Sequence, residues 1–341
     1  MNSRKLLASV FVLVTLCVTT YPVTVFGQRS NTSKPGYIES AVVANNVQFR
    51  FDAAYNNPFP DRAEFFYAKC GCFDQVVRGV SAADAGPGPP NPETSVDYQE
   101  YDTHIEFASS TWFSTFVEIP IRSINPDIND NATGLGDIRV GFKYALIADD
   151  DAWLTFITRC YFPTGEGDKG LGTEHVSIEP GLLFQGTTGR TSLFSEFKAW
   201  VPISSEQERF PNPFPGSTDP LENFAGTVLR YGVGLGYDLY QECGTNCCSP
   251  CCACGSSVQN RLTAIAEVVG WSVLDGLKFR IDPLAGNALV YQEAAGDTIV
   301  NLKLGMRWST PRDTIYIGYG RALTDEIWYK DLLRAEYSFY Y

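Results

Sequence analysis

The sequence predicts an all-β protein, an antiparallel transmembrane β-barrel of about 12 strands. Apolar and polar residues alternate with period 2 in runs of about ten residues, and the links between these runs are alternately short and long. The chain also ends on such a run, in which one face carries Leu333, Ala335, Tyr337, Phe339 and Tyr341. An aromatic terminal strand of this kind is typical of a barrel that closes against its first strand in lipid.

The first residues have the pattern of a secretory signal peptide. Arg4 and Lys5 precede an apolar run at 6–18, and small and polar residues follow, so we assign 1–27 to the signal peptide. No later apolar run is long enough for a membrane helix. We expect 28–45 to be a periplasmic N-terminal lead and 46–341 to be the outer-membrane barrel. The sequence leaves open whether the lead plugs the pore.

The composition favours β structure and excludes some partners. The chain has 18 Tyr, 22 Phe and 30 Gly, and its mean hydropathy is only -0.11. A net charge of -13 argues against nucleic acid as a partner, because nucleic acid binds basic surfaces. A secreted acidic β-sandwich has a similar composition, but sandwich strands usually have about five or six residues. The longer runs of this chain therefore favour the barrel.

Twelve strands follow from the alternation. They are expected at 47–55, 97–107, 113–122, 138–146, 152–162, 176–185, 193–203, 227–239, 261–272, 300–308, 315–319 and 333–341. The run at 152–162 is less regular, because Trp153 and Ile157 share a face with Arg159. A long loop is expected at 57–96, which contains a Pro/Gly-rich stretch, and a Cys-rich insert at 241–257.

The links predict the orientation of the barrel. Short turns are expected at 109–110, 149–151, 187–189 and 309–312, and most of the other links are long. Outer-membrane barrels have short periplasmic turns and longer outer loops. An even number of strands places both termini on the side of the short turns, which is the periplasmic side.

The charged residues fall on the face opposite the apolar one and are the candidates for lining the lumen. They are Arg50, Asp52, Asp102, His104, Glu106, Glu118, Arg122, Arg139, Lys143, Glu179, Glu196, Lys198, Arg230 and Glu267. Charges of mixed sign can line a narrow water-filled channel. They can also pair only with one another and fill the interior, and the sequence does not identify which of them would contact cargo.

The cysteines are candidates for disulfide bonds in an exported protein. These candidates are Cys70, Cys72, Cys243, Cys247, Cys248, Cys251, Cys252 and Cys254. Cys247 or Cys248 with Cys251 also has the spacing of zinc ligands, but export favours oxidation, so no metal is expected. One of the ten cysteines lies in the signal peptide, so nine remain and at least one is either free or bonded to another molecule. Cys160, inside a strand, is the expected free thiol.

Enzyme motifs are weak in this chain, and we expect neither enzymatic activity nor a cofactor. His104 and His175 are the two histidines, and both fall on the inward face, whereas an outer-membrane lipase needs its base at the lipid-facing side. The glycines at 232–236 lie inside a strand and do not have the spacing of a dinucleotide-binding turn.

Three glycine-rich motifs resemble a known family. Residues 134–144, 162–173 and 178–182 are similar to the outer-membrane transporters grouped as "MetA-pathway of phenol degradation" proteins, and the resemblance extends from about residue 98 to the terminus. It implies a barrel in the bacterial outer membrane that passes small hydrophobic or aromatic molecules. The alternative is a non-transporting structural or surface-binding barrel. The expected partners are outer-membrane lipid, the barrel-assembly machinery through the C-terminal strand, and a small-molecule cargo.

Overall fold

A computed structural model describes most of the chain after the lead begins. The described residues are 33–58, 60, 88–91, 93–203, 209–210, 222–223, 225–243, 258–282 and 288–341. The predicted signal peptide, most of the loop at 57–96 and most of the Cys-rich insert lie outside them. Among the described residues no helix is both long and apolar enough to cross a membrane.

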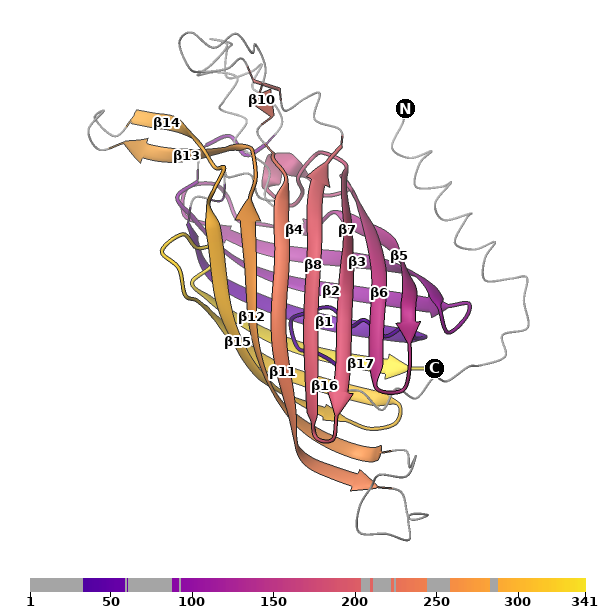
Figure 1. The fold of residues 1–341 in the computed structure, drawn as a ribbon. Coiled ribbons are helices and arrows are strands. Elements are labelled where there is room, and N and C mark those ends of the chain that lie inside the picture. The colour runs from indigo at the N-terminus through magenta and orange to yellow at the C-terminus, as the bar shows by residue number, and fades with distance from the viewer. Residues whose placement is uncertain are drawn as a thin grey trace.

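Twelve long antiparallel strands form one closed barrel, as the sequence predicted (Figure 1). They are β1 (Asn46–Pro58), β2 (Ser95–Ala108), β3 (Phe113–Pro126), β5 (Ile138–Ala148), β6 (Ala152–Phe162), β7 (Ser177–Thr188), β8 (Thr191–Pro202), β11 (Val228–Cys243), β12 (Val258–Val273), β15 (Thr298–Ser309), β16 (Asp313–Ala322) and β17 (Asp331–Tyr340). The last strand closes on the first, from Asn46 opposite Tyr340 to Tyr55 opposite Asp331. Closure leaves no unpaired sheet edge, which is the requirement for crossing lipid with strands.

Several short elements decorate the barrel. They are β4 (Ala132–Leu135) beside β3, β9 (Arg209–Phe210) paired with β10 (Glu222–Asn223), β13 (Leu277–Asp282) paired with β14 (Ala288–Glu293), and the 3-10 turn η2 (Gly167–Lys169). The sequence predicted no strand between 272 and 300, whereas this link contains the β13–β14 hairpin. Figure 1 shows β10, β13 and β14 beyond one end of the barrel.

The alternation in the sequence becomes an apolar outside and a charged inside. On β16, for example, Ile315, Ile317 and Tyr319 are exposed, whereas Tyr316 is buried. The same division holds on the terminal strand, where Tyr337 and Phe339 are exposed and Glu336 is buried. Strands of 10 to 16 residues with an apolar outer face have the length and the surface that a bilayer core requires.

The two ends of the barrel differ. At one end, here named the turn rim, short links join β2 to β3, β5 to β6, β7 to β8 and β15 to β16, and β1 begins where β17 ends. The longer links lie at the opposite end, here named the loop rim. The predicted alternation of short and long links is thus confirmed, with the Cys-rich insert between β11 and β12 as the long link at the turn rim.

Residues 33–45, here named the plug, lie inside the barrel (Figure 1). Ser33 is near the turn rim, where its hydroxyl donates to the Thr263 hydroxyl at 3.1 Å. The Tyr37 ring lies deeper, edge-on to the ring of Trp271 with centroids 6.2 Å apart, close to the loop rim. The Asn45 side chain is back at the turn rim, where it accepts the Ala108 N–H at 2.7 Å. The plug therefore enters from the turn rim, reaches its tip near Tyr37 and returns to the start of β1.

Candidate functional site

The lumen of the barrel contains the candidate site. Of the fourteen predicted lumen-lining residues, twelve are buried, and Arg50 and Arg230 are half-buried. Period-2 alternation brings them onto one face of neighbouring strands, so opposite charges meet across the sheet. Their proposed role as the lining of an open channel stays a prediction.

One group of charges spans β1, β2, β3 and β5. Arg50 pairs with Asp102 at 2.7 Å, and Arg122 pairs with Glu100 at 2.6 Å. Arg139 reaches both carboxylates, with distances of 3.3 Å to Asp102 and 3.4 Å to Glu100. Glu100 was not among the predicted residues, although counting back by two from Asp102 along the same face would have found it.

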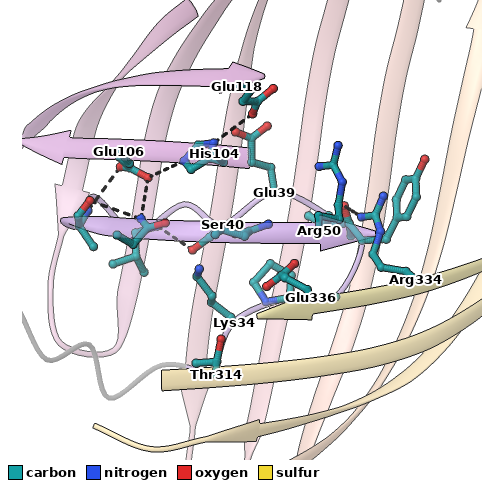
Figure 2. A pocket seen from close by; sticks show the side chains of 18 of the residues that line it. Lys34, Glu39, Ser40, Arg50, His104, Glu106, Glu118, Thr314, Arg334 and Glu336 are labelled. Atoms are coloured by element: carbon teal, nitrogen blue, oxygen red, sulfur yellow. Dashed lines mark hydrogen bonds and ion pairs between the residues drawn. The ribbon is translucent and has the colours of Figure 1, made fainter. Parts of the chain in front are cut away.

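A second group surrounds His104. Its Nδ1 lies 3.1 Å from the Glu118 carboxylate and its Nε2 lies 3.5 Å from the Glu106 carboxylate, as Figure 2 shows. Glu106 also accepts from the Lys143 ammonium at 3.1 Å and from the Ser114 hydroxyl at 2.6 Å. Both ring nitrogens of His104 are thus committed to carboxylates.

Arg159 connects the wall to the plug. Its guanidinium pairs with Glu179 at 2.8 Å and Glu118 at 3.0 Å on the wall, and with Glu39 of the plug at 2.9 Å. Lys198 also pairs with Glu39, at 3.3 Å. The burial of Glu39 would raise the pKa of its carboxyl, but Arg159 and Lys198 outweigh that effect and hold the pKa well below its usual range. The plug therefore places a charged carboxylate between two buried cations of the wall.

The wall also holds the plug backbone. The Glu267 carboxylate accepts three consecutive N–H groups, from Gly36 at 2.9 Å, Tyr37 at 2.6 Å and Ile38 at 3.2 Å. Among the described residues no basic side chain forms an ion pair with Glu267. Successive N–H groups that converge on one anion are a strong binding arrangement, so Glu267 is an anchor of the plug.

Buried apolar side chains pack around both parts of the plug. Toward the turn rim, Ala41, Val42 and Val43 pack with Phe116, Ala145, Trp153, Ile157 and Leu183. Toward the loop rim, Ile38 belongs to a larger cluster that includes the rings of Trp200, Trp271, Trp328 and Tyr329. In the sequence, Trp153 and Ile157 were noted only as an irregularity, because they share a face with Arg159. The alternation did not predict the aromatic cluster.

A cavity of about 770 Å³ lies between the plug and the wall. Its lining includes plug residues from Lys34 to Ala44 and wall residues from both rims, such as Arg312 at the turn rim and Trp271 at the loop rim. Figure 2 shows Lys34 and Glu39 inside the barrel among these side chains. This volume lies within the range of about 300–1,000 Å³ that is usual for small-molecule sites.

The cysteines give a partial result. Cys160 is a free thiol on β6, as predicted. Seven of the disulfide candidates lie outside the described residues, namely Cys70, Cys72, Cys247, Cys248, Cys251, Cys252 and Cys254. Cys243 ends β11, and the structure describes its backbone alone. Their pairing stays a prediction.

Comparisons with known proteins give similar barrels. The NanC porin has 10% sequence identity and a TM-score of 0.43, and the match covers 86% of this chain and 100% of that one. The β domain of the Bordetella autotransporter BrkA has 12% identity and a TM-score of 0.44, covering 87% and 100%. LpxR from Salmonella typhimurium has 9% identity and a TM-score of 0.39, covering 86% and 100%.

The sequence comparisons give one match. A search of curated proteins finds none for this chain. A sequence model of the family described as "Putative MetA-pathway of phenol degradation" matches residues 91–197. This part of the chain contains the three glycine-rich motifs on which the resemblance was based. Over these residues the chain is similar to that family, which confirms the resemblance that the motifs predicted. The predicted extension of the resemblance from 198 to the terminus stays a prediction.

Proposed function

We propose that this protein is an outer-membrane channel for small hydrophobic or aromatic molecules, and that residues 33–45 hold it closed in the conformation described here. The observation that carries the proposal is the plug itself. The side chains of the wall alone do not fill this lumen. Residues 33–45, which precede the first barrel strand, occupy part of it, and a cavity of about 770 Å³ remains beside them. A lumen closed by a separable segment can open without unfolding the wall.

The outer surface of the barrel is the basis for proposing an outer-membrane location. Exposed apolar side chains cover the outer face of the strands, and the terminal strand carries exposed Tyr337 and Phe339. These features support an outer-membrane location, with lipid around the barrel and assembly through the C-terminal strand. The turn rim is then the periplasmic end, and the plug enters from the periplasm.

The inward histidines support a non-enzymatic role. His104 engages two carboxylates. The Nδ1 of His175 lies 2.9 Å from the Thr173 carbonyl oxygen, and its ring packs edge-on against Trp200. Neither of these contacts joins the imidazole to a nucleophilic hydroxyl or thiol, the pairing that a hydrolytic barrel would use.

A permanently sealed structural or surface-binding barrel is the second candidate. The packing of Ala41 and Val43 favours it, because both are buried as completely as core residues. In that case the charged network only fills the interior and the plug never leaves.

Single-channel conductance in planar bilayers separates the two candidates. Glu267→Ala removes three charge-assisted hydrogen bonds to the plug, each worth about 1.5–3 kcal/mol. Since about 1.4 kcal/mol is a tenfold change in an equilibrium, the open fraction should rise at least about tenfold. The matched control is Glu93→Ala. Glu93 is also buried and accepts three consecutive N–H groups, from Asp127, Ile128 and Asn129, but these belong to a loop rather than to the plug. We expect the control to stay closed.

A cross-link provides a second test that leaves the Glu267 anchor intact. The hydroxyl oxygens of Ser33 and Thr263 are 3.1 Å apart, so Ser33→Cys with Thr263→Cys brings two thiols together across plug and wall. Opening should disappear under oxidation and return with reductant, whereas the single Ser33→Cys variant should not respond. If the wild type, Glu267→Ala and the reduced double variant all fold, as shown by a heat-modifiability gel, and all stay sealed, the sealed barrel is the correct reading.

A further inference from the structure

The tip of the plug places a phenol ring between two cations. The Lys303 Nζ lies 4.1 Å from the centroid of the Tyr37 ring, and the Arg334 Cζ also lies 4.1 Å from it. Both distances are well within the roughly 6 Å over which a cation is attracted to an aromatic face. The Tyr329 hydroxyl donates to the Tyr37 hydroxyl at 3.3 Å, and Trp271 packs edge-on. The ring therefore has cations over its face, an aromatic neighbour edge-on and a hydrogen bond to its hydroxyl.

Lys303 is the unusual member of this group. It is 2% exposed, yet among the described residues no carboxylate forms an ion pair with it. The other basic side chains on the inward face of the described barrel strands each pair with a carboxylate. The Lys303 ammonium donates to the Tyr329 hydroxyl and faces the rings of Tyr37 and Tyr329. A buried charge without a counterion is costly unless polar or aromatic groups stabilise it, so this position favours an electron-rich ring with an acidic oxygen.

We propose that Lys303, Arg334, Trp271 and Tyr329 form a binding subsite for a single phenol-type ring, and that Tyr37 of the plug occupies it when the channel is closed. Cargo and plug tip then compete for one site. A phenol that binds there shifts the population toward the released tip, because a ligand that binds one of two states favours that state. This inference rests on the proposed function and adds the cargo class and its means of opening the channel.

The neighbouring cavity gives a ring access to the subsite. Tyr37, Trp271, Tyr329 and Arg334 all line the cavity of about 770 Å³. A small solute in that space can approach the subsite while the plug is still seated. An aliphatic ring would fill the same volume, but it has no quadrupole to attract Lys303 and Arg334.

Binding of phenol to the purified full chain in detergent tests the inference. Tyr37→Leu removes the competing ring and frees both of its cation–π contacts for the ligand, so phenol should bind about tenfold more tightly than to the wild type. Cyclohexanol, which has the same size and hydroxyl, should show no such gain. The matched control is Tyr340→Leu. It removes a phenol ring that lies 4.9 Å from the Lys34 Nζ and leaves the subsite intact, so phenol affinity should equal that of the wild type.

Adding Lys303→Met to Tyr37→Leu should return phenol affinity to the wild-type level or below. Equal phenol affinity in Tyr37→Leu and the wild type, or an equal gain for cyclohexanol, would overturn the subsite even if Glu267→Ala still opens the channel. Conversely, tight phenol binding by Tyr37→Leu in a barrel that never conducts would overturn the channel and retain the subsite.

Discussion

The two limbs of the plug are held in different ways. The entering limb, residues 33–38, is held mostly by hydrogen bonds from its backbone to the wall. Gln185 donates to the Ser33 carbonyl oxygen at 2.8 Å, Arg307 donates to the Pro35 carbonyl oxygen at 2.6 Å, and Glu267 accepts from the tip. The returning limb, residues 39–45, begins with the Glu39 ion pairs and continues as apolar residues packed against the wall.

This difference indicates which limb moves. Hydrogen bonds to the wall can be exchanged for hydrogen bonds to water, at a net cost of about 0.5–1.5 kcal/mol for a neutral bond and about 1.5–3 kcal/mol for a bond to a charged group such as Arg307 or Glu267. Burying an apolar side chain has no such substitute, and its exposure costs about 1.5–3 kcal/mol for a residue the size of valine. The returning limb also runs directly into β1, so we expect the entering limb and tip to leave first and the returning limb to stay beside β1 as the hinge.

The largest effect on plug seating should come from a charge placed in the returning limb. Val43 is 1% exposed, and Val43→Asp places a carboxylate among apolar side chains, which should cost about 3–5 kcal/mol in plug seating. The expected results are continuous conductance and protease access to the plug. Ser40→Asp is the control, because Ser40 is half-buried and lines the cavity, where water can solvate the charge. Equal conductance in the two variants would show that apolar packing does not hold the returning limb in place.

A smaller effect on plug seating should come from a substitution at Glu39, where the two limbs meet. Glu39→Gln weakens the bonds to Arg159 and Lys198 but leaves no cation unpaired, because Arg159 keeps its wall carboxylates and Lys198 keeps Glu196 at 2.9 Å. We expect a loss of about 1–3 kcal/mol in seating and an open fraction raised about tenfold in conductance records. The control is Glu166→Gln at an exposed pair, whose loss should change nothing measurable. An unchanged open fraction in Glu39→Gln would show that this ion pair does not hold the plug.

Much of the wall could be predicted from the sequence, because its physical cause is local. A barrel strand must alternate, so the inward face can be counted in steps of two, and this placed Asp102, Glu118 and Arg139 correctly on the inside. The same counting misses residues where the inward face is mixed. Arg159 shares its face with Trp153 and Ile157, so no clear polar stripe marked it.

The plug could not be predicted in this way, because its position is set by long-range contacts. Residues 33–45 have no strand or helix period before β1 begins, and Glu39 meets Arg159 across 120 positions of sequence. The subsite around Tyr37 likewise joins β12, β15, β17 and the link before β17. No local pattern records that four such segments meet at one ring.

A pH dependence of plug seating should also separate the two limbs. Burial lowers the pKa of Lys34, in the entering limb, from 10.5 to about 8, and Glu336 offsets this only in part. Below pH 8 Lys34 is charged in both the seated and the released plug, so seating carries the full cost of burying the charge. Between pH 8 and 10.5 the seated side chain loses its proton first, and the seated state therefore gains stability as pH rises. Glu39 stays charged throughout this window, because its pKa is lowered and its contribution is lost only in strong acid. The open fraction in conductance records should fall between pH 8 and 10.5 in the wild type and stay level in Lys34→Met. A matching fall in the variant would assign the dependence to other groups and leave the entering limb without a titrating residue.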